Sequence, residues 1–105
     1  MSTTRHWTMY DIKKAIRGAG SHWFDPDTMR HFRCRVSEIV YQGEGGIYFV
    51  SSEVMLGGPR AYSVRHFTPD GKHGPYIDTI GEVNSLARSA AHTKARNLAK
   101  GELTR

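Results

Sequence analysis

The sequence predicts a single α+β domain, in which one helix precedes an antiparallel sheet of three to four strands and another helix follows it. Two observations predict this order. Short alternations of apolar and polar residues, separated by Gly- and Pro-containing turns, fill residues 33–80. Apolar residues three and four apart mark a helical segment near each end. The 105 residues are about one domain's length, and 38% hydrophobic content is enough for a core.

The first helix has start and stop signals. Thr8 and Asp11 have the spacing of a capping box, and Gly18 and Gly20 end the segment. Its expected buried face consists of Met9, Ile12 and Ile16. Residues 1–7 are expected to form a flexible arm, anchored at Trp7.

A second, shorter helix is predicted after this one. Asp25 is suited to the N-cap and Pro26 to the first helical position. Four large apolar side chains around it are expected to pack the first helix onto the sheet: Trp23, Phe24, Met29 and Phe32.

The strands are predicted at residues 33–41, 47–54, 61–68 and 76–80. In the second of them, Tyr48 and Val50 share one face while Ile47 and Phe49 share the other. Residues 42–46 and 56–60 have turn composition, and residues 69–75 form a loop. Such short connections between successive strands predict an antiparallel meander.

The last helix is predicted to begin with Asn84 as its N-cap and to end at Gly101. An apolar stripe of small residues indicates that it lies close against the sheet: Val83, Ala87, Ala91, Ala95 and Leu98.

The charge is unevenly distributed along the chain. The net charge is +5, with +4 in residues 1–35, −3 in residues 36–83 and +4 in residues 84–105. A basic surface formed by the two ends would suit a polyanion, although a merely solvated surface explains a net charge of this size equally well.

Cationic residues on the last helix are the strongest candidates for a binding site. Arg88, His92, Arg96 and Lys100 recur every four residues, a spacing that lets one helix side follow a phosphate backbone. We expect Lys94 on the same helix, and Lys13, Lys14 and Arg17 on the first helix, to extend this nucleic-acid-binding surface. The alternative is an ordinary solvated helix face.

No assembled catalytic or metal site is expected. Cys34 lies in an alternating strand, where an inert thiol is the better interpretation, and it has no second cysteine for an internal disulfide. The histidines have no metal-ligand spacing, and Gly43–Gly46 lacks the lysine of a phosphate-binding loop. The sequence therefore predicts a protein without cofactor or metal, and not an enzyme.

Three resemblances add to this interpretation. The Gly20-Ser21-His22 stretch resembles that of the HicA-type toxin ribonucleases, which implies a catalytic His22; the alternative is a turn with an exposed histidine. Residues 20–100, through segments such as Ile47–Glu53, Ala61–Arg65 and Asp78–Glu82, are similar to small uncharacterised bacteriophage and mobile-element proteins. Three strands followed by a helix also resemble the arm-type DNA-binding domains of phage integrases, AP2-like domains and double-stranded-RNA-binding domains.

Two main functions follow as hypotheses, both in the cytoplasm of a bacterial host. The first is a non-enzymatic, phage-type accessory protein that binds DNA or RNA through the basic last helix. The second is a phage-encoded, anti-defence inhibitor that binds a host protein through the acidic middle segment. That segment contains Glu38, Glu44, Glu53, Asp78 and Glu82. A HicA-like ribonuclease is a third alternative. A homodimer formed by pairing of edge strands is also possible.

Overall fold

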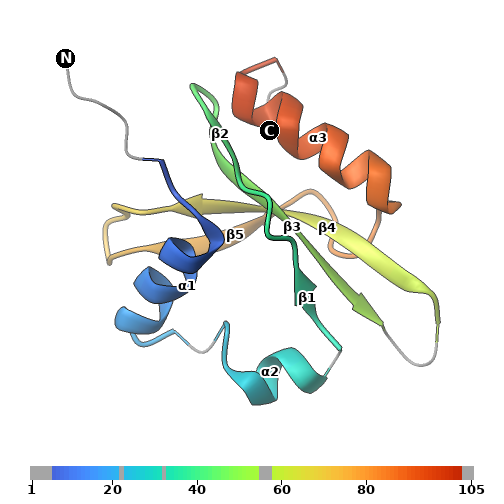
Figure 1. Cartoon of the computed structure of the whole chain (residues 1–105), viewed down its shortest axis with the longest axis horizontal. Coiled ribbons are helices and arrows are strands. Elements are labelled where there is room, and N and C mark those ends of the chain that lie inside the picture. Colours follow the sequence, from blue (N-terminus) through green and yellow to red (C-terminus); the bar gives the residue numbers. More distant parts are fainter. Residues whose placement is uncertain (1–5, 22, 32, 55–57, 103–105) are drawn as a thin grey trace.

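A computed structural model describes residues 6–21, 23–31, 33–54 and 58–102 of the chain. Within these residues, three helices and five strands follow one another in the predicted α+β order (Figure 1). The elements are α1 (Met9–Gly18), α2 (Pro26–His31), β1 (Arg35–Val36), β2 (Tyr41–Gly43), β3 (Gly46–Val54), β4 (Arg60–Thr68), β5 (Tyr76–Ile80) and α3 (Arg88–Lys100).

The strands form one antiparallel sheet. β3 pairs with β4 and β4 pairs with β5, while β1 and β2 both pair with the outer edge of β3. Figure 1 shows α1 and α3 on opposite sides of this sheet, with α2 near β1. The sheet is therefore the middle layer of three, and each of its faces is covered by one long helix.

Alternation along β3 divides the core into two clusters, as predicted. Tyr48 and Val50 pack with α3, whereas Ile47 and Phe49 pack with α1. The α3 cluster depends on small helix residues, because Ala91, Ala95, Leu98 and Ala99 are all buried against the sheet. These two clusters fix α1 and α3 to opposite faces of the same sheet.

The first helix has the predicted signals. Thr8 and Asp11 form a capping box, and Met9, Ile12 and Ile16 are buried. Trp7 packs edge-on against Phe67 at 5.0 Å between ring centroids. Residues 1–5 of the expected arm, and Phe32 of the expected packing group, lie outside the described residues.

The start of α3 differs from the prediction. The helix begins at Arg88 with Ala87 at the N-cap, not with Asn84. Asn84 has a left-handed backbone (φ 57°), and its side chain donates to Glu53 Oε1 at 2.9 Å. Leu86 instead bridges to Tyr62 of β4 through two backbone hydrogen bonds, so the chain is still on the sheet edge where a helix was expected. Consequently Val83 and Ala87 are exposed and do not belong to the buried stripe.

The first predicted strand, residues 33–41, is also different. It is two short strands, β1 and β2, and residues 37–40 between them belong to neither. Gln42 and Gly43 belong to β2 rather than to the turn, which consists of Glu44 and Gly45. A sheet edge that is interrupted in this way leaves room beside β3 for a cleft.

The C-terminal half of α3 lies directly on the β2–β3 turn. Gly45 N–H donates to the Ala99 carbonyl at 3.0 Å, and a Cβ atom at Gly45 would lie only 1.8 Å from the Leu98 oxygen. Glycine is required at this contact because the helix backbone fills the space of a side chain. Within the part of the chain that the structure describes, no helix has the length and apolar character needed to cross a bilayer.

Candidate functional site

A cleft of about 400 Å³ opens between the N-terminal half of α3 and the end of the sheet at β1. Three arginines and one histidine line it, together with Glu38 and the polar side chains of Ser37, Ser52 and Tyr62. The cationic residues are Arg35, Arg60, Arg88 and His92. We call this hollow the arginine cleft.

Strand pairing places two of these arginines side by side. Arg35 of β1 is opposite Ser52 of β3, and Ser52 is opposite Tyr62 of β4. Arg60, two residues before Tyr62, donates from Nη1 to Ser52 Oγ at 3.0 Å and to the Arg33 carbonyl at 2.9 Å. The Arg60 guanidinium is thus held in place, while its Nη2 has no partner among the described residues.

The other two cationic residues come from α3. Arg88 is its first residue, and the Leu86–Tyr62 bridge two residues earlier fixes its position over β4. His92 lies one turn further along, where its Nδ1 is 2.8 Å from the Tyr41 hydroxyl of β2. When Tyr41 donates in this bond, the remaining proton of a neutral His92 is on Nε2.

The arginine cleft carries uncompensated positive charge. The side chains of Arg35 and Arg88 have no hydrogen bond or ion pair with any residue that the structure describes. Burial lowers the pKa of His92, and the nearby charges of Arg88 and Arg96 lower it further. With His92 neutral, the three arginines and Glu38 give the cleft a formal net charge of two positive units. Positive charge concentrated in a hollow attracts anions more strongly than the same charge dispersed on a surface.

A second, more open hollow continues from the arginine cleft toward α2. It shares Arg35 and Arg60 with the cleft, and Arg30, Arg33, Cys34 and Met29 also line it. Arg30 pairs with Asp27 at 2.9 Å, and both side chains are exposed. Together these residues form the arginine band: Arg30, Arg33, Arg35, Arg60 and Arg88.

The structure divides the predicted binding residues among three surfaces. Arg88 and His92 line the cleft, and Arg96 and Lys100 are exposed further along α3. Lys94 lies on the other flank of the helix, because its Nζ is 3.4 Å from the position of a Cβ atom on Gly81, after β5. Lys13, Lys14 and Arg17 line a separate hollow on α1, beyond the sheet. The first helix therefore does not extend the α3 surface.

On the opposite sheet face, one arginine is part of the interior. Arg65 is 8% exposed; its Nε donates to Ser51 Oγ at 2.8 Å and its Nη1 to Thr79 Oγ1. Its guanidinium also lies over the Trp23 ring at 5.2 Å from the centroid. Nearby, burial and then Glu53 raise the pKa of Cys34, so this thiol stays protonated at neutral pH.

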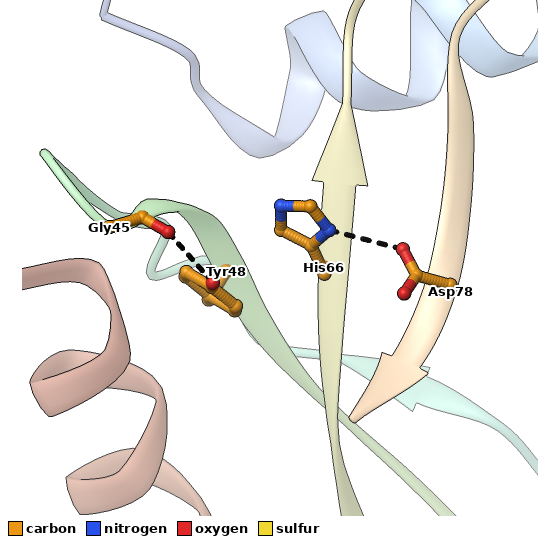
Figure 2. Close-up of polar contacts among 4 residues, drawn as sticks. All are labelled: Gly45, Tyr48, His66 and Asp78. Atoms are coloured by element: carbon orange, nitrogen blue, oxygen red, sulfur yellow. Dashed lines mark hydrogen bonds and ion pairs between the residues drawn. The ribbon is translucent and has the colours of Figure 1, made fainter. Parts of the chain in front are cut away.

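A histidine–aspartate pair lies toward the other end of the sheet. Figure 2 shows His66 of β4 beside Asp78 of β5, with His66 Nδ1 3.1 Å from Asp78 Oδ1. The Tyr48 ring stacks near His66, and its hydroxyl donates to the Gly45 carbonyl at 2.8 Å. This cluster joins three strands and the β2–β3 turn through two hydrogen bonds and one ring contact.

The acidic residues of the middle segment lie in different local environments. Glu38 lines the arginine cleft, Glu53 binds Asn84, Asp78 pairs with His66, and Glu44 lies in the β2–β3 turn. No cluster of three or more His, Cys, Asp or Glu side chains suited to a metal ion occurs among the described residues. His22 lies outside these residues, so the structure does not place it.

Two residues of the cleft, Arg35 and Arg60, were not among the predicted site residues. They are 25 positions apart in the sequence, and only the pairing of β1 and β4 on either side of β3 brings them together. The alternation of residues along the strands does contain a signal. It places Arg35 and Arg60 on the sheet face that packs against α3.

The comparisons with known proteins identify a family. Residues 8–97 match the model described as Family of unknown function (DUF7447). The chain belongs to this family. No curated protein and no solved structure matches it. The match includes every residue of the arginine band, so the family assignment covers the candidate site.

Proposed function

We propose that this protein is a non-enzymatic nucleic-acid-binding protein, and that the arginine band is its contact with the phosphate backbone. One observation carries the proposal: two adjoining hollows share Arg35 and Arg60 and are lined by five arginines. Arginine is the side chain best suited to phosphate, because its planar guanidinium donates two parallel hydrogen bonds. A phage-type accessory role in a bacterial cell is part of the same proposal.

The position of the band supports a strand lying across the end of the sheet. It runs from α2 over β1 to the start of α3, so it connects two surfaces that the sheet otherwise separates. Exposed Arg96 and Lys100 continue from the cleft along α3. The predicted surface, α3 extended by Lys13, Lys14 and Arg17 of α1, is replaced in this proposal by a band in which α3 provides one end.

Salt dependence of binding tests the proposal. Fluorescence anisotropy of labelled single-stranded and duplex DNA and RNA would be recorded at several salt concentrations. In the Arg35→Gln/Arg88→Gln double variant, affinity should fall roughly a hundredfold, because two charge-assisted contacts are lost. The slope of log K against log[salt] for a single strand should become shallower by about 1.4, since each phosphate contact contributes about 0.7.

A matched control removes the same charge elsewhere. Lys14→Gln/Lys72→Gln alters two exposed lysines outside the arginine band and should leave both the affinity and the slope nearly unchanged. If the control weakens binding as much as the band variant does, binding depends only on total charge and the band is not the site. If the wild type binds no nucleic acid at low salt, the proposed function is wrong.

A further inference from the structure

We infer that the arginine cleft holds a phosphate monoester, and that in the proposed function this group is the terminal phosphate of a nucleic-acid strand. This inference rests on the proposed function for the source of the phosphate. The chemistry of the cleft itself supports the monoester. The second hollow, by contrast, would hold internal phosphates of the same strand.

Charge is the first argument. Three arginines and one glutamate leave two positive units in a single hollow when His92 is neutral. A phosphate monoester carries about −1.5 to −2 at neutral pH, whereas an internal phosphodiester has only one negative charge. The net charge of the cleft therefore matches a terminal phosphate more closely than a phosphate within the chain.

The availability of donors is the second argument. Arg35 and Arg88 have no intramolecular partner among the described residues, so binding breaks no existing ion pair. Arg60 is fixed by Ser52 and the Arg33 carbonyl through Nη1 alone, which leaves Nη2 for a ligand. A monoester has three terminal oxygens that accept hydrogen bonds, and the cleft offers a separate guanidinium for each.

Size and Glu38 provide the third argument. A volume of about 400 Å³ falls within the range of small-molecule sites and accommodates a group of nucleotide size. The exposed Glu38 carboxylate lines the same cleft and would repel a second phosphate that followed the first. A strand can thus end in the cleft more readily than it can pass through it.

The test compares strand ends. Binding of three labelled ten-nucleotide single strands of one sequence would be measured: one with a 5′-phosphate, one with a 3′-phosphate and one with hydroxyl groups at both ends. At least one phosphorylated strand should bind about tenfold more tightly than the hydroxyl strand, since an extra charge-assisted contact is gained. Adenosine 5′-monophosphate and inorganic phosphate should compete selectively for this added affinity.

Two arginine variants separate the cleft from the rest of the band. Arg88→Gln should remove the preference for the phosphorylated end. Arg30→Gln, a band residue outside the cleft, should weaken all three strands equally and keep the preference. Thermal unfolding followed by circular dichroism would show that both variants remain folded. If Arg88→Gln does not fold, Arg35→Gln provides a second cleft variant.

The possible outcomes distinguish this inference from the proposed function. If all three strands bind wild type equally, the inference is wrong while nucleic-acid binding stands. If adenosine monophosphate or phosphate binds the cleft but no strand does, the monoester site is supported and the proposed function is wrong. A phosphoserine peptide that binds more tightly than any strand overturns the nucleic-acid source. Absence of binding by every probe overturns both ideas.

Discussion

Arg65 and Arg88 have the same charge and lie on opposite faces of one sheet, but their surroundings differ in every respect. Arg65 is 8% exposed, donates to two hydroxyl groups and lies over an indole ring. Arg88 is exposed, lines a cleft and has no partner among the described residues. A buried arginine with its donors satisfied stabilises the fold, whereas an arginine without partners can exchange water for a ligand.

The two halves of α3 also differ in whether they contact the rest of the fold or border the arginine cleft. Its C-terminal half is in direct contact with the β2–β3 turn, through Ala99 and Gly45. Its N-terminal half borders the arginine cleft, which is lined by Arg88 and His92. Buried Ala91 also holds the N-terminal half on the sheet, so this half packs on one flank and lines the open hollow with another.

The largest effect is expected from Arg65→Met. This change removes the donor to Ser51 and Thr79 and a positive charge that interacts with Glu53, so we expect a loss of about 3 kcal/mol in the free energy of unfolding. Urea unfolding would measure it. Arg96→Met, on the exposed side of α3, should change stability by no more than about 0.5 kcal/mol. Equal losses in the two variants would contradict the distinction between the faces.

Ala91→Leu should have the next largest effect. Ala91 is fully buried between α3 and the sheet, and a larger side chain overpacks this contact at a cost of about 1–3 kcal/mol. The adjacent Ala90 is exposed, so Ala90→Leu is the matched control and should be nearly neutral in the same unfolding measurement. A small loss for Ala91→Leu would mean that the helix can move away from the sheet without cost.

Most of the fold was predictable because its signals are local. The capping box at Thr8 and the alternation of Tyr48 and Val50 with Ile47 and Phe49 depend on neighbours in sequence, and the structure confirms them. Asn84 was assigned wrongly for the opposite reason. Its side chain is suited to an N-cap, but its contacts with Ser63 and Glu53 come from distant strands. Local propensity cannot reveal such competitors.

The candidate site was less predictable than the fold. Spacing on α3 correctly indicates that Arg88 and His92 are neighbours, but it does not show which flank of the helix meets the sheet, and Lys94 lies on the other one. Arg35 and Arg60 join the site through strand register, a property that depends on the pairing of whole strands. The sequence therefore identifies the charge, and the topology determines where it is concentrated.

Arg60→Gln tests both roles of an arginine at one position, because Arg60 makes hydrogen bonds within the fold and also lines the arginine cleft. Its bonds to Ser52 and to the Arg33 carbonyl are structural, and Arg33 has a left-handed backbone (φ 51°) that this contact helps to hold. We expect a loss of about 1 kcal/mol in stability, together with weaker binding of nucleic acid. Unfolding and anisotropy measurements on one preparation would check both. A variant with normal binding would exclude Arg60 from the site.

The smallest effect concerns the pH dependence of the free protein. Burial, Arg88 and Arg96 lower the pKa of His92 in the folded state. The unfolded chain therefore binds this proton at higher pH than the folded chain does, and the His92 contribution to stability is lost as the pH falls below about 6.5. Below the pKa of His92 in the folded state, this contribution to stability no longer changes with pH. The measurable quantity is the difference between wild type and His92→Gln, followed as melting temperature from pH 7.5 to 5, because this difference isolates the contribution of His92.

The pKa of His92 should also change when phosphate binds in the arginine cleft. An anion in the arginine cleft offsets the charges of Arg88 and Arg96, so it raises the pKa of His92. The probe is the strand whose terminal phosphate the cleft is inferred to hold, and the strand with hydroxyl ends is the control that should leave the His92 pKa nearly unchanged. Because a terminal phosphate itself titrates near pH 6, the His92 ring is followed directly and not through the affinity. NMR titration of the His92 ring, with and without the strand, measures both pKa values. An unchanged His92 pKa on saturation would place the bound phosphate outside the cleft, even if the salt dependence still assigned it to the arginine band.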